Sequence, residues 1–303
     1  MRLVTIPLTV FAACFGQPHD PASPAKVVPL YLERFAAKEA LWGADDPRLA
    51  SLARETGQFL LRAGDPAAER FLARALALDE KTHGTVHEQV AEDLELLATA
   101  RRSEALPLLD RALSIREKLP KPDGVALVSL YRKVGDLLAA AGRMADARRR
   151  TTLAVAAAEK WLPPGHPLLA SVIVDLGFLH ESERQFAEAE RHYRRALAIQ
   201  EKTLGPRHLE VAVTLNNLGG VTGAQGRLAQ AEPLLRRALR ILESSVGPNH
   251  TRTAAAAANL ADLLAASGRP TAAIPLWNRA IVIYQQLGDD AAAAVVRQSM
   301  QGR

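Results

Sequence analysis

Apolar residues recur along this chain in pairs of helical stripes separated by short turns. In residues 207–248, one stripe precedes the turn near Gly226 and another follows it, with apolar positions three and four residues apart. The first stripe contains Val213, Leu215, Leu218 and Val221, and the second contains Leu228, Ala231, Leu235, Ala238 and Ile241. This pattern predicts two amphipathic helices joined by a tight turn, which is a helical hairpin.

The hairpin repeats with a period of 42 residues. Three series of small residues keep this spacing: Ala105, Ala147, Ala189, Ala231 and Ala273; Ala112, Ala154, Ala196, Ala238 and Ala280; and Gly135, Gly177, Gly219 and Ala261. Three series with one period indicate similar units that stack on one another. The series His166, His208 and His250 marks the junctions, where we expect each histidine to close a turn onto the following helix.

Prolines suggest where the second helix of a unit begins. Pro107, Pro233 and Pro275 each lie two residues after an alanine of the first series. Proline fits the first turn of a helix because the N–H groups there have no internal partner. We therefore expect the second helix to begin just before its proline.

These residues carry a resemblance to a known family. A small residue after Leu on the first helix is followed twelve residues later by Ala, with Leu four and Ala seven residues beyond it. This arrangement resembles the tetratricopeptide repeat (TPR), and the 42-residue form is similar to the repeats of kinesin light chains and their bacterial relatives. HEAT and armadillo repeats have an overlapping length and are the alternative, but they do not require these small-residue series.

The resemblance implies an all-α fold, a right-handed α-solenoid of helix-turn-helix repeats. We expect a leading half-repeat at 26–44, repeats at about 45–84, 85–122, 123–164, 165–206, 207–248 and 249–288, and a capping helix within 289–303. Such an array curves, and the first helices of its repeats are expected to line the concave surface.

Residues 1–25 have a different character. After Arg2, residues 3–16 form an uncharged apolar run of signal-peptide length, too short to span a bilayer as a helix. Cys14, the only cysteine, resembles the acylated cysteine of a bacterial lipobox, although Phe11 stands where that motif usually has Leu. A Pro- and Ser-rich tether follows. We expect export with a lipid anchor at Cys14, and a cytoplasmic protein is the alternative.

Composition adds little about the partner. The chain has 303 residues, a formal net charge of +5 and 5% aromatic residues. The small positive excess favours acidic partners weakly, whereas the scarcity of aromatic side chains removes stacking platforms for single-stranded nucleic acid. A basic nucleic-acid binder is therefore the least favoured function.

The sequence contains none of the common catalytic or phosphate-binding motifs: G-x-x-x-x-G-K-[ST], H-E-x-x-H, G-x-S-x-G or paired Cys-x-x-Cys. The glycine-rich stretch 219–226 lies within a predicted helix and its turn rather than after a strand. His83 and His87 are four residues apart, but Gly84 lies between them and no third metal ligand is evident. We expect no catalytic residue, no metal, no cofactor and no small-molecule substrate.

The candidate binding site is the concave groove. The resemblance assigns peptide binding to Asn216, Asn217 and Asn259, which match asparagines that hold the backbone of an extended peptide in kinesin-light-chain-type repeats. An amide suits this task because it donates to C=O and accepts from N–H. Gly220 would leave room for the ligand's backbone, and Arg132 with Lys133 would favour a peptide with an acidic residue. The alternative is that the asparagines bridge neighbouring helices.

These observations predict a noncatalytic protein-interaction scaffold that binds an extended segment of a partner protein. A structural or self-associating spacer at the cell envelope is the second hypothesis.

Overall fold

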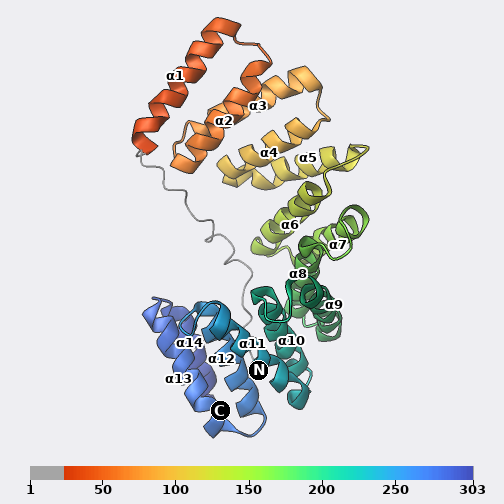
Figure 1. Cartoon of the computed structure of the whole chain (residues 1–303), viewed down its shortest axis with the longest axis vertical. Coiled ribbons are helices and arrows are strands. Elements are labelled where there is room, and N and C mark those ends of the chain that lie inside the picture. Colours follow the sequence, from red (N-terminus) through yellow and green to blue (C-terminus); the bar gives the residue numbers. More distant parts are fainter. Residues whose placement is uncertain (1–23, 303) are drawn as a thin grey trace. The chain divides into compact units, whose positions relative to one another are not determined.

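In the computed structural model, residues 24–302 are described, and every regular element among them is helical (Figure 1). Of the described residues, 24–150 belong to one compact unit and 151–302 to a second. The Cys14 interpretation lies outside the described residues. The prediction of an all-α fold built from paired helices is confirmed.

The N-terminal unit consists of consecutive helices that pack on their neighbours. These are α1 (Pro24–Trp42), α2 (Arg48–Ala63), α3 (Ala68–His83), α4 (Glu88–Ala100), the 3₁₀ turn η2 (Arg102–Glu104), α5 (Ala105–Lys118) and α6 (Gly124–Ala140). The main pairs are α2 with α3 and α4 with α5. A core that includes Phe35, Leu49, Leu60 and Phe71 is buried between α1, α2 and α3.

Helix α7 (Met144–Trp161) leads from the first unit into the second. The C-terminal unit continues with α8 (Pro167–Ser182), α9 (Phe186–Leu204), α10 (Leu209–Ala224), α11 (Leu228–Ser245), α12 (Thr251–Ala266), α13 (Pro270–Gln286) and α14 (Asp290–Gln301). Helices α8/α9, α10/α11 and α12/α13 form hairpins, and α14 packs on α13 in the range where the capping helix is expected (Figure 1). Leu215, Leu235 and Trp277 lie in the core of this unit.

The small-residue series allow the two helices of a hairpin to approach closely. A Cβ added at Gly219 would lie 2.7 Å from the Leu235 side chain, and one added at Gly177 would lie 2.7 Å from the Tyr193 ring. Ala231 and Ala238 are fully buried on the second helix. The small residues of these series therefore serve the close packing of the paired helices.

The turn between the paired helices needs a left-handed backbone. Gly226 has φ +80°, a conformation that costs glycine little because it has no Cβ. Arg184 occupies the equivalent position 42 residues earlier and has φ 61°. It is the one described residue other than glycine with positive φ.

The junction histidines begin the first helices, as predicted. The Nδ1 atoms of His166, His208 and His250 accept hydrogen bonds from the backbone N–H groups of Leu168, Glu210 and Arg252, at 3.1, 3.2 and 3.1 Å. Each histidine thus acts as an N-cap in its neutral form, because Nδ1 must carry no proton to accept this bond.

The expectation about helix starts is correct for one proline and wrong for two. Helix α5 begins at Ala105, so Pro107 lies in its first turn. Helices α11 and α13 begin at Leu228 and Pro270, and Pro233 and Pro275 lie inside them. Both helices start directly after the glycine-containing turn, about one helical turn earlier than their prolines indicate. Each helix tolerates the one backbone N–H donor that its proline lacks.

Ion pairs join the second helices of successive hairpins. Arg195 contacts Glu159, Arg237 lies 2.6 Å from Glu201, and Arg279 lies 2.5 Å from Glu243. Both partners are shifted by 42 residues at each step. The arginine at this position therefore has a structural role that recurs through the C-terminal unit.

Candidate functional site

The inner helices of the C-terminal unit carry polar residues at equivalent positions. Asp175, Asn217 and Asn259 lie 42 residues apart on α8, α10 and α12, and Asn216 precedes Asn217. These side chains are buried: Asn216, Asn217 and Asn259 are 1%, 3% and 2% exposed. A polar row thus runs through the inside of this unit, where each unmet hydrogen bond costs free energy.

The amides of this row contact one another. Asn259 Nδ2 donates to Asn216 Oδ1 at 3.1 Å, which joins α12 to α10, and Asn216 Nδ2 donates to Asn217 Oδ1 at 3.5 Å. The first bond gives the asparagines the bridging role that the sequence left open as an alternative. Asn259 Oδ1, however, is buried and has no hydrogen-bond partner. It is an acceptor available to an incoming N–H group.

Aromatic side chains from the second helices bond to carboxylates of the first helices. Tyr193 on α9 is fully buried, and its hydroxyl donates to Glu181 Oε2 at 2.8 Å. Burial raises the pKa of Glu181 to about 7, while the bond from Tyr193 lowers it. Trp277 Nε1 on α13 donates to Asp262 at 2.9 Å. These contacts hold the outer helices in register with the inner ones.

The other predicted binding residues divide between the units. Gly220 is buried on α10, one turn from Asn216. Arg132 and Lys133 are half-buried on α6 in the N-terminal unit, and Lys133 Nζ donates to Thr99 Oγ1 at 3.4 Å. The structure therefore brings together the three asparagines and Gly220 but does not place the two basic residues in the same unit.

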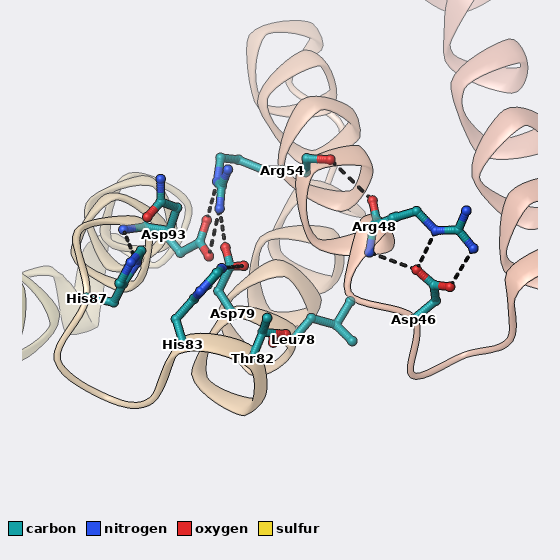
Figure 2. A network of polar contacts seen from close by, with 11 residues as sticks. Asp46, Arg48, Arg54, Leu78, Asp79, Thr82, His83, His87 and Asp93 are labelled. Atoms are coloured by element: carbon teal, nitrogen blue, oxygen red, sulfur yellow. Dashed lines mark hydrogen bonds and ion pairs between the residues drawn. The ribbon is translucent and has the colours of Figure 1, made fainter.

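A buried charge cluster in the N-terminal unit was not anticipated from the sequence. Figure 2 shows Arg54 of α2 reaching between Asp79 of α3 and Asp93 of α4. Arg54 Nε donates to Asp93 Oδ1 at 2.6 Å, and its Nη2 contacts Asp79. Asp79 and Asp93 are 4% and 0% exposed. One guanidinium thus links three helices through two buried carboxylates.

The environment of this cluster shifts the pKa of Asp93. Burial raises the pKa of Asp93 to about 7, and Asp79 adds to the increase, while Arg54 opposes it. His83 Nε2 lies 3.7 Å from Asp79 Oδ1, and the His83 and His87 rings stack with centroids 4.3 Å apart (Figure 2). His87 is also the N-cap of α4, accepting at Nδ1 from Gln89 N–H at 3.4 Å. The two histidines therefore have structural contacts of their own.

A sequence signal for this cluster existed. Asp93 lies three residues after Val90 and four before Leu97, both buried, so it occupies the apolar face of α4. A carboxylate in that register needs a partner when buried. Sequence spacing alone does not identify Arg54, which lies two helices earlier.

Two further features concern metal binding and membrane insertion of the described residues. Residues 24–302 contain no group of three or more His, Cys, Asp or Glu arranged to hold a metal ion. Within the same range, no helix is both long and apolar enough to span a membrane.

Comparison with known proteins gives a repeat family for part of the chain and a fold for most of it. The tetratricopeptide repeat family model matches residues 168–244 and 216–286. No curated protein matches the chain significantly.

Proteins of several kinds have solved structures with a similar fold. They include a putative kinesin light chain from Podospora anserina with nearly identical TPR-like repeats, at 23% identity and TM-score 0.54, covering 66% of this chain and 97% of that one. Aspartyl phosphate phosphatase F from Bacillus subtilis has 15% identity and TM-score 0.61, covering 95% and 84%. YrrB, described as a TPR protein with an unusual peptide-binding site, has 17% identity and TM-score 0.51, covering 74% and 98%.

Identities this low establish the fold alone. The match to the family model spans α8 to α13, and the paired helices of the chain agree with the fold of these neighbours. The chain has the fold of tetratricopeptide-repeat proteins, and its residues 168–286 match the model of that family.

Proposed function

We propose that this protein is a noncatalytic scaffold that binds an extended peptide segment of a partner protein along α10 and α12. The observation that carries the proposal is the buried amide row that ends in an unpartnered acceptor, Asn259 Oδ1. An extended peptide presents N–H groups at regular intervals, and one of them would satisfy this atom.

Burial of the amides sets a condition on binding. Because Asn216, Asn217 and Asn259 are at most 3% exposed, the inner face has to open before a peptide main chain can reach them. The Asn259–Asn216 bond would then be exchanged for bonds to the peptide, so the net gain per bond is about 1 kcal/mol. Recognition through main-chain groups places few demands on the partner's side chains.

The fold supports a binding function in general terms. YrrB shows that a protein with this fold has a peptide-binding site. The phosphatase among the structural neighbours shows that the fold also occurs in an enzyme. The proposal of a noncatalytic role therefore rests on the sequence, which lacks the common catalytic motifs.

Selection from a random peptide library tests this function. Purified full-length protein would be used to select binders, and their affinities would be measured by fluorescence polarisation. We expect extended peptides, and Asn259→Ala should weaken their binding about tenfold, the equivalent of one or two hydrogen bonds. Asn249→Ala, at an exposed junction position, is the matched control and should have no effect.

Two results would contradict the proposal. One is the absence of any saturable peptide binder for a wild-type protein that is shown to be folded by circular dichroism. The other is binding that survives both Asn259→Ala and the double variant Asn216→Ala, Asn217→Ala. A change of oligomeric state in these variants, measured by light scattering, would instead favour the structural spacer.

The proposal includes export with acylation at Cys14, which the N-terminal sequence supports. Expression of the wild type and of Cys14→Ser in a bacterial host, with a radiolabelled fatty acid, tests this directly. We expect label and membrane fractionation only for the wild type. An unlabelled wild-type protein in the soluble fraction would favour the cytoplasmic alternative.

A further inference from the structure

A basic depression lies on the second-helix side of the C-terminal unit. It has a volume of about 390 Å³ and is lined by Pro206 and Arg207 of the junction after α9 and by Arg237, Arg240, Ile241 and Ser244 of α11. Three guanidinium groups therefore border one small cavity. Repulsion among them disfavours this arrangement unless negative charge is nearby.

Only one of these arginines has a structural partner. Arg237 is the member of the repeating ion-pair series: it lies 2.6 Å from Glu201 and donates to the Pro206 carbonyl at 2.9 Å. Arg279 repeats both contacts one unit later, with Glu243 at 2.5 Å and the Pro248 carbonyl at 3.3 Å. Folding of the repeat therefore explains Arg237.

The other two arginines have no structural explanation. Arg207 and Arg240 are exposed, and neither forms an ion pair or hydrogen bond with the described residues. The repeat period provides an internal comparison. Position 207 corresponds to Gly165 and Asn249, and position 240 corresponds to Ala198 and Val282. The additional positive charge is thus specific to this junction and is not a requirement of the repeat.

We propose that this depression, the arginine pocket, binds a phosphate monoester. Three arginines and the one carboxylate of Glu201 leave two uncompensated positive charges, which match the dianion that a phosphate monoester forms above its second pKa of about 6. Guanidinium groups bind phosphate oxygens with paired N–H donors. Ile241 provides an apolar wall that limits solvation of these contacts.

The source of the monoester is either a phosphorylated protein side chain or a free small phosphate. The site has no residue in common with the amide row, because its residues lie on α11 and in the junction between α9 and α10, whereas the row lies on α8, α10 and α12. Failure of peptide binding at the amides would therefore leave this proposal standing, and the reverse is also true.

Calorimetric titration of the full-length protein with inorganic phosphate, O-phosphoserine and serine tests the proposal. At low ionic strength we expect saturable binding of both phosphates and none of serine. The double variant Arg207→Ala, Arg240→Ala should lower phosphate affinity about tenfold or more, because it removes both uncompensated charges. Binding should also weaken from pH 7.5 to pH 5 as the ligand becomes a monoanion.

A matched variant separates site binding from net charge. Arg62→Ala with Arg102→Ala removes the same charge from exposed positions in the N-terminal unit and should bind phosphate as the wild type does. Tighter binding of a phosphoserine peptide than of O-phosphoserine would identify a protein source, whereas equal affinities would identify a free phosphate. No saturable binding by the wild type, or equal losses in the two double variants, would overturn the proposal.

Discussion

Replacing Arg54 with methionine should destabilise the N-terminal unit more than any other single charge removal in it. The substitution keeps most of the side-chain volume but leaves Asp79 and Asp93 buried without their shared cation. Removing one partner of a buried ion pair costs about 3–5 kcal/mol, because the remaining charge is left uncompensated. We expect a loss near that range at pH 8.

The pH dependence of this loss gives a sharper test. Burial already holds the pKa of Asp93 at about 7 in the presence of Arg54, above its unfolded value of 3.8, and removing the cation raises it further. A carboxyl group whose pKa is raised on folding binds its proton more tightly in the folded state. Its contribution to stability is therefore full below the unfolded pKa and is lost as pH rises through the folded pKa. Arg54→Met should recover about 1.4 kcal/mol for each pH unit lowered from 8 toward 5.5.

Hydrogen exchange measured by mass spectrometry over α2, α3 and α4 provides the assay, because repeat arrays open locally and a single unfolding transition is not assured. Arg62→Met on the same helix is an exposed control and should change local stability by less than about 0.5 kcal/mol. The double variant Arg54→Met, Asp93→Asn should recover much of the loss at pH 8, since one buried charge is removed. The reasoning is wrong if Arg54→Met matches Arg62→Met, or if its loss grows on acidification.

Three further predictions follow from comparing equivalent positions in the repeats. Arg184→Gly should raise the free energy of unfolding by about 1 kcal/mol, and with it the melting temperature, because glycine relieves the left-handed strain that Gly226 avoids. An unchanged melting curve would count against strain at this position. Gly177→Ala should lower the free energy of unfolding by about 1–2 kcal/mol in urea titrations, since the cost of overpacking against the buried Tyr193 ring exceeds the gain in helix propensity. A stabilised variant would show that the ring moves aside. Burial, with Arg252 nearby, lowers the pKa of His250 below 6.5, so the contribution of His250 to stability falls as the pH drops below 6.5. His250→Asn keeps a capping side chain that does not titrate, and it should reduce the loss of stability between pH 7 and pH 5 in calorimetric scans. An acid loss equal to that of the wild type would contradict the capping argument.

The helical hairpins and their packing were predictable from sequence because the information is local and repeated. Gly219 faces Leu235 across one hairpin, and the same spacing brings Gly177 against Tyr193. The capping role of His208 was likewise indicated by its place ahead of an apolar stripe. Each of these features depends on a few adjacent turns, so the period reveals it several times.

The candidate site was predictable only in part. The sequence placed Asn216 and Asn259 on the same inner face, and the structure joins them by a hydrogen bond. Their burial was not predictable, because it depends on how closely successive helices pack. Arg54 was also missed, since the register that buries Asp93 does not show which helix supplies its cation. Contacts between elements that are not repeated in the sequence leave no periodic signal.

Departures from the period therefore separate structural residues from candidates for function. Arg237 recurs as Arg279, and both positions hold the same pair of contacts, so selection for folding is sufficient to explain them. Arg207 and Arg240 do not recur, their side chains form no ion pair or hydrogen bond with residues 24–302, and they lie beside the same depression. In an array whose neighbours tolerate Asn249 and Val282 at these positions, two uncompensated charges have no role in stability. Binding of a negatively charged ligand in the arginine pocket gives a physical reason for the presence of Arg207 and Arg240.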